Sequence, residues 1–347
     1  MPSEITIKRP DDWHLHLRDG AILGEVAPYT TAHFARAIVM PNLVPPVVDA
    51  ASAVAYRSRI LAASGDSGFQ PLMTAYLTDQ SDADELVNAF HDGVIAAVKM
   101  YPAGATTNAD RGVTDVKNIY PVLEKMQETS MPLLVHGEVV GDQYDIFDRE
   151  KIFLDTILSP LHETFPSLKV VLEHITTKQS VEFVNAGLDN IAATVTPHHL
   201  MINRSTMFKG GIRPHLYCLP IAKRHEHQLA LRDAATSGSA KFFLGTDSAP
   251  HPEHDKHSAC GCAGIFNAGT ALACYAQVFE EEDRLENLEG FTSIHGPTFY
   301  ELPVNEDTLS LRRLDQPLAT PPPVGTQKIH QFLPDSPVYW QVVSVAQ

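Results

Sequence analysis

The sequence has few cysteines, no long apolar run and no apolar block near its start. Four cysteines in 347 residues are too few for a disulfide framework. The opening residues, MPSEITIKRPDDW, contain acids instead of an apolar block, and no uncharged run reaches the roughly 18 residues that a membrane span needs. We therefore expect neither export nor membrane insertion, and a cytoplasmic location.

Basic residues are also in short supply. The chain has 26 lysines and arginines against 42 acidic residues, a formal net charge of -16. Such a surface repels phosphate backbones and anionic lipid head groups, so neither a nucleic-acid nor a membrane partner is expected. With 44% hydrophobic and only 20% charged residues, the chain has ample material for a buried core.

Short apolar runs alternate with helical patterns along most of the chain. The runs that we interpret as strands are Trp13–Leu17, Ala35–Met40, Leu72–Leu77, Val94–Met100, Pro132–Val135, Val170–Leu172, Ile191–Val195 and Phe242–Leu244. The helical patterns are Ala50–Ala63, Ala83–His91, Lys117–Thr129, Arg149–Glu163, Lys178–Ala186 and Lys223–Thr236. This alternation predicts an α/β fold, an eight-stranded β/α (TIM) barrel. A doubly wound open sheet is the alternative, but its glycine-rich first turn is missing at Leu17–Gly20.

The pattern changes after Phe299. Prolines cluster at 317 and 321–323, and a β-rich tail follows over residues 336–345. We expect one domain over residues 1–347, with a barrel over about 5–300 and a short C-terminal appendage over about 301–347.

Two His-x-His pairs occur among the 17 histidines. His225 and His227 lie in a charged, helical stretch, where an offset of two points the rings in different directions. His14 and His16 close an apparent strand, whose period of two places both rings on one face. The second pair can therefore bind one metal ion.

Polar residues end four other apolar runs. These residues are Lys99, His136, His174 and Asp247. In a β/α barrel the C-terminal strand ends form the rim that carries catalytic groups, so these side chains should meet the first histidine pair in one cavity. Taken singly, each could instead be a core histidine or a cap.

Lys99 is the most informative of these residues. A free ammonium at a buried strand end among histidines would be desolvated and would repel a bound cation. Carboxylation by CO2 converts the amine into an anionic carbamate whose two oxygens can bridge two metal ions. The alternative is a lysine with a lowered pKa, or one whose head reaches the rim.

A second cluster of metal-binding residue types occupies HPEHDKHSACGC. It contains His251, His254, His257, Cys260 and Cys262. Structural zinc sites use two separated pairs of ligands, whereas these residues all fall within one short loop. We therefore do not expect a structural zinc site here.

With these residues assembled, the sequence resembles the amidohydrolase superfamily, and within it the short, bacterial-type dihydroorotases. The resemblance rests on an ordered set of motifs, DDWHLHLRDG, VMPNL, VKMYPAGATTN, LLVHGE, EHITT, LGTDSAPH and CGCAG. It implies a zinc-dependent enzyme that reversibly cyclises N-carbamoyl-L-aspartate to (S)-dihydroorotate in de novo pyrimidine (UMP) biosynthesis, and it suggests a homodimer.

The resemblance also implies a metal arrangement. His14, His16 and Asp247 would hold a more buried zinc ion, and His136 with His174 a more exposed one. Lys99, as N6-carboxylysine, would bridge both ions together with a hydroxide. Asp247 would be the catalytic proton carrier.

Substrate contacts follow partly from position and partly from the resemblance. Arg18 stands two residues beyond His16, so on a continuing strand it would project to the same side and could grip a carboxylate, unless it forms only a surface ion pair. The resemblance adds to this site the residues Asn42 and His251, main-chain groups at Leu219 and Ala263, and a mobile loop carrying Thr106 and Thr107. The competing hypotheses are another cyclic amidase or deaminase of the superfamily, and a scaffold protein without activity.

Overall fold

The computed structural model describes residues 2–346, and its centre is a parallel barrel of eight strands. The strands follow one another in chain order: β2 (Asp12–Leu15), β3 (Arg36–Val39), β4 (Gln70–Leu77), β5 (Ala97–Met100), β6 (Leu133–Val135), β7 (Val170–Leu172), β8 (Ile191–Val195) and β9 (Phe242–Leu244). A parallel bridge between Leu15 and Ser248, with a hydrogen bond from the Asp247 amide to the His14 carbonyl, joins the last strand to the first. The prediction of a TIM barrel is confirmed, and the open-sheet alternative is wrong.

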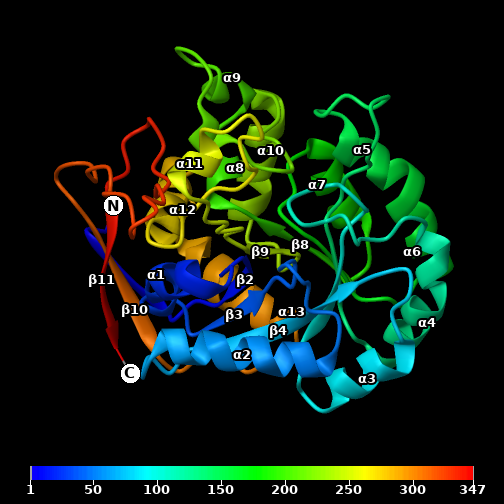
Figure 1. Ribbon diagram of the computed structural model, residues 1–347. Coiled ribbons are helices and arrows are strands. Elements are labelled where there is room, and N and C mark those ends of the chain that lie inside the picture. Colours follow the sequence, from blue (N-terminus) through cyan, green and yellow to red (C-terminus); the bar gives the residue numbers. More distant parts are fainter. Residues whose placement is uncertain (1, 347) are drawn as a thin grey trace.

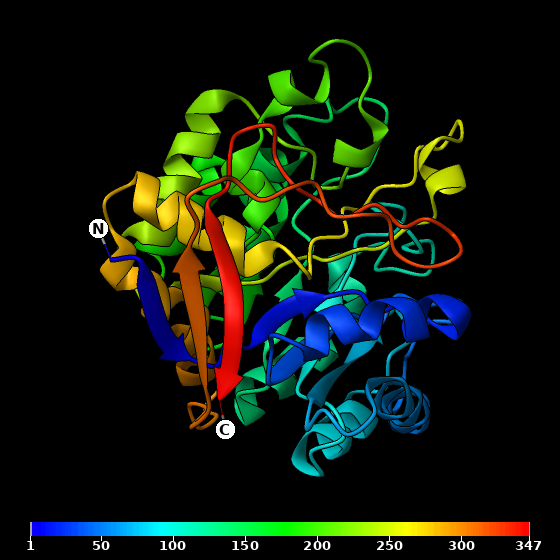
Figure 2. The same cartoon turned by 90° about the vertical axis from the view of Figure 1, so that its left-hand side faces the viewer.

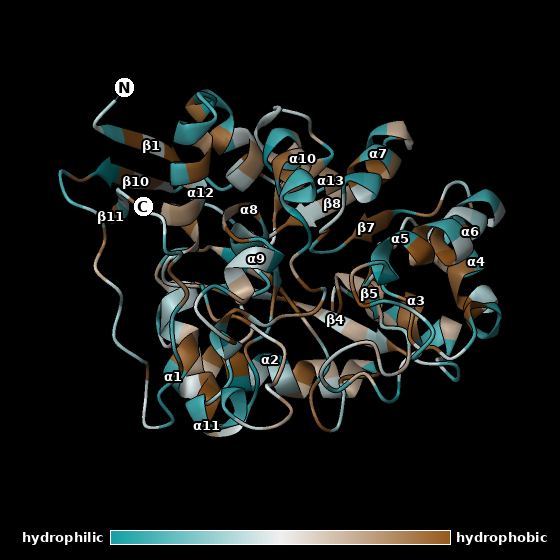
Figure 3. Ribbon diagram, turned by 90° about the horizontal axis from the view of Figure 1, so that it is seen from above, coloured by the Kyte–Doolittle hydropathy of each residue, from teal (hydrophilic) through white to brown (hydrophobic). Residues whose placement is uncertain are grey.

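Helices surround the barrel, as Figure 1 shows. They are α1 (Gly20–Thr31), α2 (Ala50–Ser64), α3 (Ala83–His91), α4 (Tyr120–Thr129), α5 (Arg149–Phe153), α6 (Ser159–Thr164), α7 (Lys178–Ala186), α8 (Pro197–Met201), α9 (Arg204–Met207), α10 (His225–Thr236), α11 (Glu253–Lys256), α12 (Ala271–Glu281) and α13 (His295–Phe299). Their teal and brown residues in Figure 3 mark outward polar and inward apolar positions on many of them. Over residues 2–346, no helix combines the length and apolar character that crossing a bilayer requires.

Six of these helices were absent from the sequence prediction: α8, α9, α11 and α13 have only four or five residues each, and α1 and α12 are longer. Helix α1 contains Pro28, which removes a backbone donor and hides the helical pattern. Helix α12 is buried along ten of its eleven residues, so it has no polar face to give an amphipathic period.

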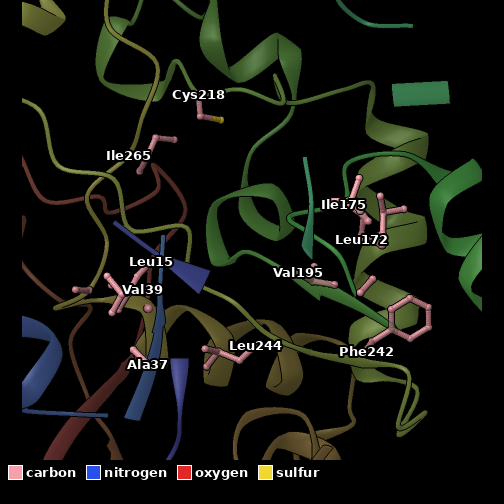
Figure 4. Packing of buried hydrophobic residues seen from close by; sticks show 14 of the residues in the cluster. Leu15, Ala37, Val39, Leu172, Ile175, Val195, Cys218, Phe242, Leu244 and Ile265 are labelled. Carbon is pink, nitrogen blue, oxygen red and sulfur yellow. The ribbon is translucent and has the colours of Figure 1, made fainter. Parts of the chain in front are cut away.

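The core has an inner and an outer part. Inside the barrel lies a cluster that includes Trp13, Ile38, Leu134 and Phe243, each at most 1% exposed. A larger cluster packs outside the strands and against the helices, and Figure 4 shows part of it, including Leu15 beside Val39. Strand residues therefore alternate between two apolar environments, as buried parallel strands do.

A separate three-stranded antiparallel sheet joins the two ends of the chain. Its central strand, β10 (Thr308–Arg313), pairs with β1 (Glu4–Lys8) on one side and β11 (Trp340–Ala346) on the other. Figure 2 shows the three strands side by side, in blue, orange and red. The appendage expected from the C-terminal residues thus includes Glu4–Lys8, and the first barrel strand begins at Asp12.

Candidate active site

The residues that face the barrel interior change from apolar to polar near the C-terminal ends of the strands. On β5, Ala97 belongs to the inner cluster and Lys99 follows two residues later, on the same face. On β6, Leu134 belongs to that cluster and His136 follows just beyond the strand. The period of two therefore places polar groups directly above an apolar layer.

Strand β2 also places polar side chains above the apolar layer, but its pairing with β3 is irregular. Its pairing with β3 shifts register between Asp12 and Leu15. Trp13 consequently packs inside the barrel while Leu15 packs outside it. Asp12 fixes this segment, because its carboxylate accepts hydrogen bonds from the His14 amide at 3.2 Å and from Thr246.

His174 and Asp247 have left-handed backbone conformations, with φ of 41° and 45°. A left-handed non-glycine residue is strained, and such residues concentrate at functional sites. The His174 amide donates to Thr194 Oγ1 at 2.7 Å, which holds the turn after β7 in place. This turn lets two consecutive residues, Glu173 and His174, both contribute to the site.

The predicted histidines and Asp247 come together at the barrel rim. Asp247 Oδ1 lies 3.5 Å from His14 Nε2 and 3.2 Å from His16 Nε2. The His174 ring is 4.7 Å from the His14 ring and 4.9 Å from the His136 ring, measured between centroids. The ligand atoms of His14, His16 and Asp247 lie within 4.8 Å of one another, close enough for one metal ion.

Buried glutamates orient two of these histidines, and the sequence analysis missed them. Glu173 Oε2 accepts from His14 Nδ1 at 2.8 Å, and it also accepts from Thr194 at 2.5 Å. Glu138 Oε2 accepts from His136 Nε2 at 2.9 Å. Carboxylates behind histidines are typical of metal sites, where they fix the tautomer and the ring orientation. Their positions next to the histidines, in the EH and HGE motifs, were the available signal.

Three polar atoms of the site fit a bound metal. Lys99 Nζ, His14 Nε2 and His174 Nδ1 are buried, and among the described residues none has a hydrogen-bond partner. A buried polar atom without a partner is costly. Burial also lowers the pKa of Lys99 to about 8, against the opposing effect of Glu173 and Asp247. The donor set, the orphaned atoms and a lysine that readily becomes a neutral amine suit cations bridged by a modified lysine.

The electrostatics keep Asp247 ionised and His16 neutral. Burial by itself would raise the pKa of Asp247, but the adjacent His14 and His16 side chains hold it well below its usual value. Burial lowers the pKa of His16 to about 4. A carboxylate and a neutral imidazole are the forms that bind a divalent cation.

Arg18 reaches the site by a different route from the one predicted. Strand geometry ends at Leu15, and Arg18 is left-handed with φ of 57°. Its guanidinium nevertheless lines the same cavity, donating to the Pro250 carbonyl at 3.2 Å and to His251 Nε2 at 2.9 Å. Burial and the nearby Arg18 charge lower the pKa of His251 to about 2, so this ring is a neutral imidazole, and its Nε2 also lies 3.0 Å from the Ala263 carbonyl.

The remaining predicted substrate residues line this cavity too. Asn42, Thr106, Thr107, Leu219 and Ala263 all contribute to its wall. Asn42 accepts from His16 Nδ1 at 2.8 Å and donates to the Thr107 carbonyl at 2.9 Å. Thr107 also donates to the Ala263 carbonyl at 3.4 Å, so the threonine loop contacts both the segment after β3 and the segment after β9.

The loop cluster that we did not expect to bind zinc is only partly assembled. His251, Asp255 and Cys262 approach one another within 4.8 Å, whereas His254, His257 and Cys260 are not in that group.

The neighbouring charges disfavour a cation beside His251. The pKa of this ring is lowered by burial and then by the positive charges of Arg18 and Lys256. These charges would also repel a metal ion.

Comparison with known proteins gives a consistent result. The model of the amidohydrolase family matches residues 6–305. A protein named dihydroorotase from Chelativorans sp. (strain BNC1) is 56% identical over 341 residues, covering 97% of this chain and 99% of the relative. Another dihydroorotase, from Erythrobacter litoralis, is 59% identical over 315 residues, covering 90% and 92%.

Solved structures agree with this result. A crystal structure of dihydroorotase from Campylobacter jejuni superposes with a TM-score of 0.86 at 36% identity, covering 99% of this chain and 98% of that one. Dihydroorotase from Saccharomyces cerevisiae, in complex with 5-fluoroorotic acid, gives 0.88 at 33% identity and 99% coverage of both chains. An L-hydantoinase from Arthrobacter aurescens shares the fold, with a TM-score of 0.81, at only 14% identity and with 84% of its own chain covered.

Proposed function

The chain belongs to the amidohydrolase family, and we propose that it acts as a dihydroorotase, reversibly cyclising N-carbamoyl-L-aspartate to (S)-dihydroorotate in pyrimidine (UMP) biosynthesis. The enzyme is a hydrolase of cyclic amides. The observation that carries the choice of substrate is the position of Arg18 on the wall of the cavity that also contains His136, His174 and Asp247. A cation aimed at this cavity suits a substrate with a carboxylate beside the scissile amide.

The donor set supports two zinc ions. His14, His16 and Asp247 would hold one, His136 and His174 the other, and Lys99 carboxylated to N6-carboxylysine would bridge both with a hydroxide. Such a pair of ions supplies a nucleophilic hydroxide at neutral pH and polarises the amide carbonyl. Lys99 suits carboxylation because its amine is buried, has no partner among the described residues and has a pKa of about 8.

Asp247 serves as the proton carrier. Its carboxylate lies at the centre of the histidine cluster and is ionised, so it can accept a proton when water attacks the ring amide. The proton then passes to the leaving amide nitrogen. In the direction of ring closure, the same carboxylate accepts the proton from the attacking nitrogen.

Arg18, Asn42 and His251 bind the substrate carboxylate. His251 already contacts Arg18, and Asn42 Nδ2 could exchange the Thr107 carbonyl for a substrate oxygen. Main-chain groups of Leu219 and Ala263 bind the edge of the ring.

Thr106 and Thr107 form a lid that covers the bound acid and excludes water. Thr107 already contacts the Ala263 carbonyl, so the loop is in reach of the opposite wall.

We also propose that the enzyme is cytoplasmic and a homodimer. The small anionic substrate would enter a locally cationic pocket on an acidic protein, whose formal charge is -16.

Size-exclusion chromatography with light scattering tests the proposed homodimer, and a monomeric mass would overturn it.

The direct test follows dihydroorotate hydrolysis by absorbance with the wild-type protein and Lys99→Ala, both supplied with zinc and bicarbonate. We expect activity in the wild type and its loss in the variant. Activity on a neutral cyclic imide but not on dihydroorotate would favour another cyclic amidase of the family. Less than one zinc per chain and no activity would favour a scaffold.

A further inference from the structure

Lys256 is a buried lysine whose ammonium group donates to three main-chain carbonyls and lies 5.7 Å from the centre of the Tyr217 ring. It ends helix α11 and is 3% exposed. Its Nζ donates to the Tyr217 carbonyl at 2.9 Å, to the Cys262 carbonyl at 2.6 Å and to the Gly264 carbonyl at 2.9 Å. Three donors and three acceptors match, so the ammonium is fully satisfied.

These three carbonyls belong to the two segments that carry the proposed ring contacts. Cys262 and Gly264 flank Ala263, and Tyr217 stands two residues before Leu219. The Gly264 amide also donates to the Tyr217 carbonyl at 3.0 Å, so the segments are held together directly as well as through Lys256.

The loop around Ala263 has a backbone that needs such support. Cys262 is left-handed with φ of 26°, a conformation that is strained for a residue with a side chain. A Cβ atom at Gly264 would lie 2.7 Å from the Ala249 carbonyl, so the loop also packs closely on the segment after β9. Charge-assisted hydrogen bonds are about twice as strong as neutral ones, so one ammonium can hold this conformation.

Lys256 also adds positive charge to the pocket. Within residues 2–346 it forms no ion pair, and its charge lowers the pKa of His251, after burial and Arg18. Lys256 and His251 line one small cavity behind the Ala263 loop. An unneutralised ammonium at this place raises the potential felt by a bound carboxylate.

We propose that Lys256 is a positioning residue for substrate recognition: it holds the Leu219 and Ala263 segments in register and strengthens the cationic pocket. The proposal rests on the proposed function only for the identity of the substrate. The Lys256 ammonium donates to main-chain carbonyls and not to the proposed metal ligands, so its loss should weaken substrate binding in the ground state and the transition state equally.

The test compares Lys256→Met and Lys256→Gln with the wild type in dihydroorotate hydrolysis. We expect KM to rise about tenfold or more, as for the loss of hydrogen bonds to a charged group, while kcat stays within about threefold. Zinc content should be unchanged. Amide hydrogen exchange, followed by mass spectrometry, should be faster in peptides covering residues 216–219 and 260–265.

Lys241→Met is the matched control. Lys241 is also partly buried and also donates to two main-chain carbonyls, those of Val184 and Gly187, but away from the cavity. It should alter stability without raising KM. An equal rise of KM in this control, or unchanged KM and exchange in both Lys256 variants, would overturn the proposal.

The exchange measurement also separates this proposal from the proposed function. If the wild type does not hydrolyse dihydroorotate, the function fails. Faster exchange at residues 216–219 and 260–265 in the Lys256 variants would still support the structural role, and unchanged exchange would overturn it.

Discussion

Glu173 accepts a hydrogen bond from Nδ1 of His14 across 2.8 Å, and both side chains are almost completely buried. The bond leaves Nε2 of His14 facing Asp247, as a metal ligand requires. The orientation of this histidine thus depends on a residue that directly follows β7, a strand that does not pair with β2.

Replacing Glu173 with glutamine should weaken metal binding. The amide keeps the shape but loses the charge that orients and polarises His14, and comparable changes lower metal affinity about 10- to 100-fold. Competition with a chromophoric chelator measures this affinity. Glu301→Gln, at an exposed carboxylate paired with Lys169, is the control and should bind zinc as the wild type does.

Replacing Arg18 with alanine should raise KM for dihydroorotate by about 10- to 100-fold, because a charge-assisted carboxylate contact is lost. Steady-state kinetics with dihydroorotate and with neutral dihydrouracil measure this effect, because only dihydroorotate carries the carboxylate that Arg18 would bind. Arg59→Ala, which removes an exposed partner of Asp19, should leave KM unchanged. A KM for dihydroorotate within twofold of the wild type would contradict the carboxylate assignment.

Gly245→Ala should destabilise the site. A Cβ atom there would lie 2.6 Å from Cβ of Thr194 and 3.1 Å from Cβ of His14, and neither neighbour can move without its strand. We expect a loss of about 1–3 kcal/mol in the free energy of unfolding and lower zinc occupancy. Gly24→Ala, in helix α1 with open space at its Cβ, should be neutral or slightly stabilising. Equal free energies of unfolding for the two variants in urea would contradict this prediction, because they would mean that the neighbouring strands can shift to make room for a Cβ atom at Gly245.

Glu150 should contribute stability that depends on pH. Burial alone would raise its pKa, but Lys223 and hydrogen bonds from Ser180 and Thr176 bring the pKa below the usual value of 4.5. A carboxyl group with a lowered folded pKa stabilises the protein above its unfolded pKa, and this contribution disappears as the pH falls toward the folded pKa.

The variant Glu150→Gln should therefore be less stable than the wild type by about 1–3 kcal/mol at pH 7. The difference should narrow as the pH falls below about 4.5. Urea unfolding over this range measures it, with Glu163→Gln as an exposed control. A difference that is independent of pH would mean that packing, and not charge, explains the loss.

The sequence was most informative where burial imposes a period. Lys99 could be placed at the rim because it stands at the end of an apolar run, which the structure shows as a strand buried on both sides. The register shift in β2 could not be predicted, since it depends on the pairing with β3. The motif HGE places Glu138 beside His136, but the contact of Glu173 with His14, 159 residues away, depends on the closed barrel.

The three-stranded sheet and helix α12 could not be predicted either, because they too depend on contacts distant in sequence. Strand β10 carries alternating apolar residues, but its position is decided by Glu4–Lys8, about three hundred residues earlier. Helix α12 lost its periodic signal because both of its faces are covered. Long-range pairing and burial on all sides leave no trace in a local window of sequence.

The pairing of β1 with β10 has a consequence for biogenesis. Residues 4–8 are synthesised before the barrel strands, yet their partner strand at 308–313 is made only after the last barrel strand. The backbone donors and acceptors of β1 therefore stay without their β10 partners while the whole barrel is synthesised. During this interval β1 is available to chaperones and to mispairing with another nascent chain.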